Sequence, residues 1–253
     1  PPPMSPSSFM PRPLLLALAL VASSATAQIA PPNEVRTLAI PLVVQTGSVD
    51  YGSDETASGA SSIVPGFSVD RLDRSGPRML YRRFDISGGA AFVACYALSC
   101  SGLTEEINGV ESDNDGWVYL EGLLIPLAEG GVLFPTPVGS LGGGVTLGSA
   151  GVAGGTDTFA YGLAGVQGAY GAQLGPVTLL SLATYGVGYS YGSGEGGLTG
   201  RVIKLRTDAY IPIGRFMGIG TLTIARVTDT LGTDDSADDL GATFVTFGAG
   251  IGF

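Results

Sequence analysis

Residues 243–253 read TFVTFGAGIGF, and this stretch decides the fold. Apolar side chains stand at every second position, with threonine or glycine between them: Val245, Phe247, Ala249, Ile251 and Phe253. A period of two over this length predicts an extended strand with one apolar face. Because a sheet in lipid can leave no edge unpaired, we expect this strand to close a barrel.

The pattern resembles the carboxy-terminal strand of Gram-negative outer-membrane β-barrel proteins, in which alternating apolar residues end in Phe. The resemblance covers this stretch alone and identifies no subfamily. It implies an all-β fold, a single antiparallel transmembrane β-barrel, in the outer membrane of a Gram-negative bacterium. It also implies contact with outer-membrane lipid and lipopolysaccharide, and with the barrel-assembly machinery through the C-terminal strand.

The composition fits a barrel. The chain has 253 residues, of which 45% are hydrophobic and 13% charged, and a mean hydropathy of +0.35. No apolar run of about 20 residues lies beyond the amino terminus, so the hydropathy points to alternating strands instead of a spanning helix. A net charge of −10 argues against a nucleic-acid partner.

The chain contains no histidine, which excludes every mechanism that uses imidazole as an acid, a base or a metal ligand. Barrel hydrolases of the class that this chain resembles use histidine. We therefore expect no enzyme activity and no cofactor, and we predict no metal site.

Residues 1–27 are typical of a signal peptide. Arg12 supplies a positive charge, residues 14–21 form an apolar core, and residues 25–27 read ATA, a small-residue cleavage site. A single membrane anchor is the alternative, although the apolar run is short for one. The predicted domains are therefore a signal peptide, 1–27, and an outer-membrane β-barrel, 28–253.

Alternation predicts about ten strands, and both eight and twelve remain open because residues 63–72 fit either a strand or a loop. Two-residue turns containing glycine are expected at residues 175–176 and 214–215. The predicted strands are 36–49, 78–86, 89–99, 116–127, 131–149, 158–174, 177–191, 200–213, 216–228 and 242–253.

Lys204, Arg206 and Asp208 in the strand 200–213 share the face opposite to its isoleucines. Lipid does not tolerate such a face, so it should point into the barrel. The predicted lumen-lining residues are Glu121, Gln167, Lys204, Arg206 and Asp208. They could line a conducting channel, or they could pair with one another and fill a narrow interior.

Arg201 and Arg226 belong to the outward face. Pairing across the turn at 214–215 puts Arg226 opposite Ile203, and Arg201 lies one step further out on the same face. Arginine is costly at mid-membrane, so both are expected at the outer rim. There they could contact the phosphates of lipopolysaccharide, or simply extend into water.

Two features belong to the predicted loops. Residues 104–115 and 229–239 are rich in Asp and Glu, which fits solvated extracellular loops better than a calcium site. Cys95 and Cys100 form a disulfide if the chain turns between them, and are otherwise two free thiols.

Two kinds of function follow from these patterns. One is a porin-like passive channel or an envelope-structural barrel. The alternative is a surface-recognition or adhesive barrel that acts through its acidic extracellular loops and has a closed lumen.

Overall fold

The computed structural model describes the backbone of residues 30–50, 56–86, 117–121, 127–154, 157–191, 199–230 and 239–253. Side chains are described for residues 30–39, 66–86, 127–149, 162–187, 200–228 and 243–253. Within these ranges no helix is long and apolar enough to cross a membrane.

Twelve strands are described, and all of their pairings are antiparallel. They are β1 Val35–Asp50, β2 Thr56–Pro65, β3 Ser68–Ser75, β4 Arg78–Asp85, β5 Trp117–Glu121, β6 Leu127–Thr136, β7 Gly139–Gly154, β8 Asp157–Leu174, β9 Val177–Tyr191, β10 Thr199–Ile213, β11 Phe216–Thr230 and β12 Asp239–Gly252.

The sheet closes on itself, because β12 pairs with β11 on one side and with β1 on the other. The β1–β12 register runs from Ala39 opposite Gly252 to Asp50 opposite Gly241. Beyond the last pair, Phe253 N–H donates to the Leu38 carbonyl at 3.1 Å, and the Phe253 ring meets Phe216 edge-on at 5.7 Å. The predicted closure of a barrel by the last stretch of the chain is confirmed.

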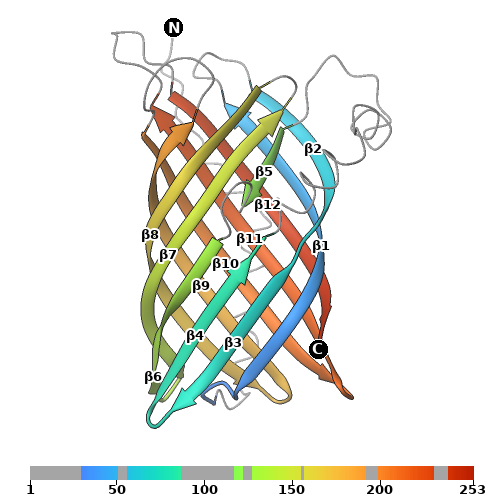
Figure 1. The fold of residues 1–253 in the computed structure, drawn as a ribbon, viewed down its shortest axis with the longest axis vertical. Helices are drawn as coiled ribbons and strands as arrows, with labels where there is room; N and C mark the ends of the chain where they lie inside the picture. The colour runs from blue at the N-terminus through green and yellow to red at the C-terminus, as the bar shows by residue number, and fades with distance from the viewer. Residues whose placement is uncertain are drawn as a thin grey trace, which may run out of the picture.

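The twelve described strands occupy ten positions around the ring (Figure 1). β2 and β3 share one position, since both pair with β1, and β5 and β6 share another, since both pair with β7. The fold is therefore a single closed antiparallel barrel of ten strands, as the alternation predicted. In ring order the positions are β12, β11, β10, β9, β8, β7, β5/β6, β4, β2/β3 and β1.

Tight turns join strands at the lower end of the barrel in Figure 1, at residues 76–77, 137–138, 175–176 and 214–215. Gly76, Gly175 and Gly214 have φ near +60°, a conformation that glycine adopts without a steric cost. Gly76 and Gly175 each precede proline, which fits a hairpin turn with glycine first. The turns predicted at 175–176 and 214–215 are confirmed.

Three predicted strands need comment. Residues 131–149 are not one strand, because the turn at 137–138 divides them between β6 and β7. The predicted strand 116–127 covers β5 but ends where β6 begins. The predicted strand 89–99 lies outside the described residues. The position filled by β2 and β3 includes residues 63–72, which the sequence left open between a strand and a loop.

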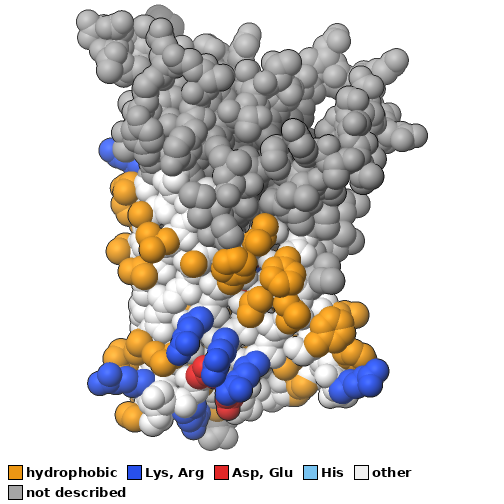
Figure 2. Space-filling view, in the orientation of Figure 1, with side chains coloured by type: hydrophobic (Ala, Val, Ile, Leu, Met, Phe, Trp, Pro, Cys, Tyr) orange, Lys and Arg blue, Asp and Glu red, His pale blue; other side chains and the backbone are white. Residues whose placement is uncertain are grey.

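Side chains alternate between the two faces of the wall. The outward face carries large hydrophobic residues on almost every strand whose side chains are described, including Val145, Val166, Ile203, Phe247 and Ile251, each more than half exposed. Figure 2 shows such side chains spread across the near wall. The inward face carries the buried polar residues and a smaller set of buried hydrophobic ones.

Glycines on β6 and β7 make room for one large interior side chain. A Cβ built on Gly131 or Gly144 would collide with the hydroxyl of Tyr81, which is itself buried. The glycine-rich stretch of this wall thus gives Tyr81 room to extend from β4 across β6 and β7.

Candidate functional site

The candidate site is a set of paired charges inside the barrel, called here the interior network. Period-two alternation turns charged side chains inward on β3, β4, β6 and β10, where their neighbours in sequence point outward. The network contains seven charged residues, none with a side chain more than 8% exposed: Asp70, Arg83, Asp85, Glu129, Lys204, Arg206 and Asp208.

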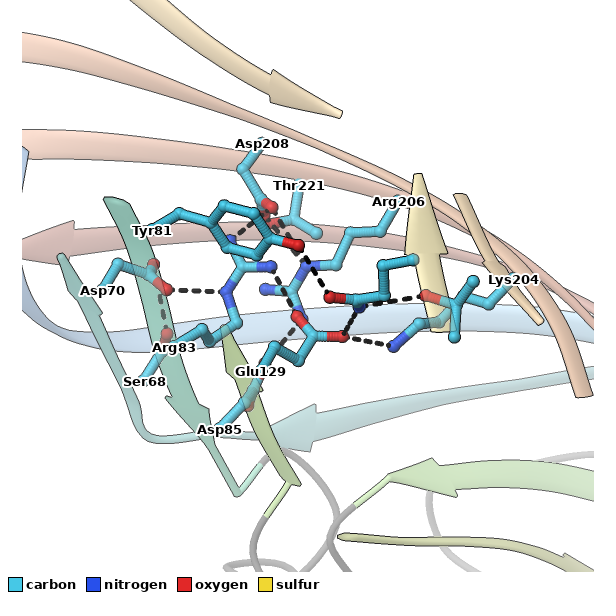
Figure 3. A network of polar contacts seen from close by, with 12 residues as sticks. Ser68, Asp70, Tyr81, Arg83, Asp85, Glu129, Lys204, Arg206, Asp208 and Thr221 are labelled. Atoms are coloured by element: carbon cyan, nitrogen blue, oxygen red, sulfur yellow. Dashed lines mark hydrogen bonds and ion pairs between the residues drawn. The ribbon is translucent and has the colours of Figure 1, made fainter. Parts of the chain in front are cut away.

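Arg83 on β4 is the centre of the network (Figure 3). Its Nε contacts Asp70 Oδ1 at 2.6 Å, its Nη1 contacts Glu129 Oε2 at 3.1 Å, and its Nη2 contacts Asp208 Oδ2 at 2.6 Å. Nη2 also donates to the hydroxyl of Tyr210 at 2.9 Å. The planar guanidinium with its five N–H donors suits this many partners, which a lysine could not bind in the same way.

A second ion pair joins β4 and β10, the strands that carry Arg83 and Asp208. Arg206 on β10 contacts Asp85 on β4 at 2.6 Å and its own neighbour Asp208 at 3.1 Å. In the ring, β4 and β10 are five positions apart out of ten, which places them on opposite walls. The Arg83–Asp208 and Arg206–Asp85 ion pairs therefore span the interior from one wall to the other.

Polar side chains on further strands complete the network. Lys204 Nζ contacts Glu129 Oε1 at 3.2 Å, and Gln167 Nε2 on β8 donates to the same oxygen at 2.8 Å. The Tyr81 hydroxyl donates to Gln167 Oε1 at 3.1 Å, and the Thr221 hydroxyl on β11 donates to Asp208 at 2.7 Å. Contacts thus reach from β3 around to β11.

Charge is nearly balanced within this network, because three cations face four carboxylates. Removing ions from water costs several kcal/mol for each ion, and only close partners offset that cost. The arrangement satisfies this condition and ties opposite walls together. No group of acidic or cysteine side chains that could hold a metal ion occurs within the described ranges.

An apolar layer lies next to the network, on the side of the tight turns. Leu72, Met79 and Leu133 are each nearer to their turn than the charged residue on the same strand. They pack in one buried cluster with side chains from β1, β8, β9, β10 and β11, among them Leu180, Leu182 and Ile219. The interior near the turns is therefore filled by two successive layers, one apolar and one charged.

The predicted lumen-lining residues fall into two groups. Gln167, Lys204, Arg206 and Asp208 are buried in the interior and belong to one network. Glu121 is on β5, and its side chain lies outside those described.

Arg201 and Arg226 are both exposed, and Arg226 pairs with Ile203 as the turn at 214–215 predicted. Arg201 is therefore its diagonal neighbour on the outer face. Whether they contact lipopolysaccharide stays a prediction.

Cys95, Cys100 and the loop 104–115 lie outside the described residues, and so do the side chains of residues 229–239.

Sequence reasoning missed Asp70, Arg83, Asp85 and Glu129. Residues 78–85 read RMLYRRFD, in which both alternating faces carry an arginine, an aromatic ring and an aliphatic side chain. The pattern therefore cannot tell which face points inward. Glu129 was overlooked because it was placed in a gap between two predicted strands. The available signal was the pairing across the turn at 76–77, which puts Asp70 directly opposite Arg83, with Asp85 on the same face of β4.

The chain matches no protein-family model and no curated protein, so the argument for its function rests on its own residues.

Proposed function

We propose that this protein is an outer-membrane β-barrel with a closed lumen, an envelope-structural barrel rather than a passive channel. The observation that carries the proposal is the pair of contacts between β4 and β10, Arg83 with Asp208 and Arg206 with Asp85. Side chains that meet between opposite walls cross the interior and obstruct the path of a solute at that level.

The membrane part of the proposal rests on the outer surface. Soluble monomers rarely expose large contiguous apolar areas, whereas a barrel in lipid places such residues on its outward face. Here the outward side chains include Leu147, Val166 and Ile203, each more than half exposed, while their polar sequence neighbours Thr146, Gln167 and Lys204 are buried. This distribution is inverted relative to a water-soluble fold.

The size of the ring supports the closed lumen. Eight-stranded barrels have an interior that their own side chains fill, and ten strands add only modest space. The interior network and the apolar layer beside it supply the filling side chains. Their charges are paired, so they present no row of unpaired charge of the kind that selects ions in open pores.

Conductance measurement tests the proposal. Purified protein is incorporated into planar bilayers, and protease protection in vesicles of the same lipid verifies insertion. We expect inserted protein to give no discrete conductance steps at any applied voltage. Steps from inserted protein would overturn the closed lumen and would favour a channel.

A further inference from the structure

The outer wall carries a row of arginines that the interior network does not use. Arg36 on β1 pairs directly with Arg71 on β3, and Arg71 pairs directly with Arg82 on β4. All three are exposed, so they form one row across three neighbouring strands, called here the arginine row. Figure 2 shows blue side chains gathered low on this wall.

An apolar row lies beside the arginine row. Leu38, Val69 and Phe84 are two residues further from the tight turns on the same strands, and Val69 pairs directly with both Leu38 and Phe84. Each is between 38% and 43% exposed. Two residues along a strand correspond to about 7 Å, so a cationic row and an apolar row run in parallel at that spacing.

Like charges at directly paired positions destabilise a sheet unless opposite charges compensate them. Arg36 contacts Glu34 at 2.6 Å and Asp73 at 3.4 Å, and Asp73 also contacts Arg71. Glu34 and Asp73 therefore compensate the positive charges of Arg36 and Arg71. Arg82 forms no ion pair with any carboxylate in the described part of the chain.

The surroundings of Arg82 favour an external anion. The position paired with it on β6 is Gly130, which has no side chain to cover the guanidinium. Arg74 and Arg78, both exposed, flank the turn at 76–77 just below the arginine row. Five arginines thus face two carboxylates here, on a protein whose overall charge is −10.

We propose that the arginine row and the apolar row together bind an anionic glycerophospholipid, with its phosphate on Arg71 and Arg82 and its acyl chains along Val69 and Phe84. Guanidinium groups bind phosphate oxygens in a bidentate manner, and apolar side chains at the next level accept the chains. The inference rests on the proposed membrane location, in which the tight turns face the periplasm and the lipid belongs to the periplasmic leaflet.

Lipid competition in micelles tests the site. Folded protein is mixed with equal amounts of phosphatidylglycerol and phosphatidylcholine that carry the same acyl chains, and native mass spectrometry counts the bound lipid. We expect the wild type to retain phosphatidylglycerol preferentially. The variant R82Q should lower this preference about fivefold, the factor that one arginine near an anionic surface contributes. R36Q/R71Q/R82Q should abolish it.

Arg215 provides the matched control, since it is exposed, lies in a tight turn at the same end of the barrel and carries the same charge. R215Q should keep the wild-type preference. An equal loss in R215Q and R82Q would reduce the effect to net charge and overturn the site, as would a wild type without preference. Protein that fails to fold in micelles would contradict the proposed membrane barrel itself.

Discussion

Arg82 and Arg83 are neighbours on β4 whose side chains point to opposite faces, and they offer a matched pair of substitutions. Arg83→Met leaves three carboxylates without their shared cation, so we expect a loss of about 3–5 kcal/mol in the free energy of unfolding. Arg82→Met removes an exposed side chain with no described ion pair, and its effect should stay within about 0.5 kcal/mol. Unfolding by guanidinium chloride in detergent micelles measures the free energy of unfolding of both variants.

The comparison separates the effect of the network contacts on stability from the effect of net charge, because both substitutions remove one positive charge and the two residues are adjacent. Equal losses for the two variants would mean that the contacts of Arg83 contribute nothing beyond those of a surface arginine. At the residue scale the sequence predicted the inward direction of Lys204, Arg206 and Asp208, because the isoleucines of that strand mark its outward side. The stretch around Arg83 has no such marker, and only its pairing with β3 and β6 fixes its orientation.

Among the elements, the pairing of β1 with β12 decides whether the ring is closed. Leu42 and Ala249 are direct partners across this pair, which puts their Cα atoms about 4.5–5.5 Å apart, within reach of a disulfide. In a C95S/C100S background, L42C/A249C should therefore cross-link on oxidation. Migration of the denatured protein with and without reductant measures the bond.

A shifted pair controls for register. Phe247 pairs with Val44, so L42C/F247C joins diagonal positions about 7–8 Å apart, and it should not cross-link. Stronger cross-linking of the shifted pair would indicate a two-residue slip. A lack of cross-linking in both variants would contradict closure at this point.

The sequence predicted the second half of the barrel better than the first. Strands β8 to β12 have long alternating patterns and unambiguous glycine turns, so their predicted limits lie within a few residues of the observed ones. For the β2/β3 position the sequence left residues 63–72 open between a strand and a loop, because residues 56–75 are rich in Ser and broken at Pro65 and Gly66, a composition that also fits a loop. The turn at 137–138 was missed because apolar residues continue on both sides of Pro137.

For the whole molecule, the outward hydrophobic side chains predict a requirement for an amphiphile during folding. Protein diluted from urea into detergent micelles should gain β structure, and in plain buffer it should aggregate, because water would have to solvate the whole apolar outer wall. Circular dichroism and size-exclusion chromatography distinguish the outcomes. A folded monomer in buffer without detergent would contradict the proposed membrane barrel.

The long sequence separation of Arg83 and Asp208 bears on when their contact forms during folding. The two residues are 125 positions apart in sequence and on opposite walls, so we expect them to meet only after the strands between them have assembled. Contacts that form after the rate-limiting step slow unfolding and leave the speed of folding unchanged. We therefore expect the Arg83–Asp208 ion pair to slow unfolding of the finished barrel and to leave its folding rate unchanged.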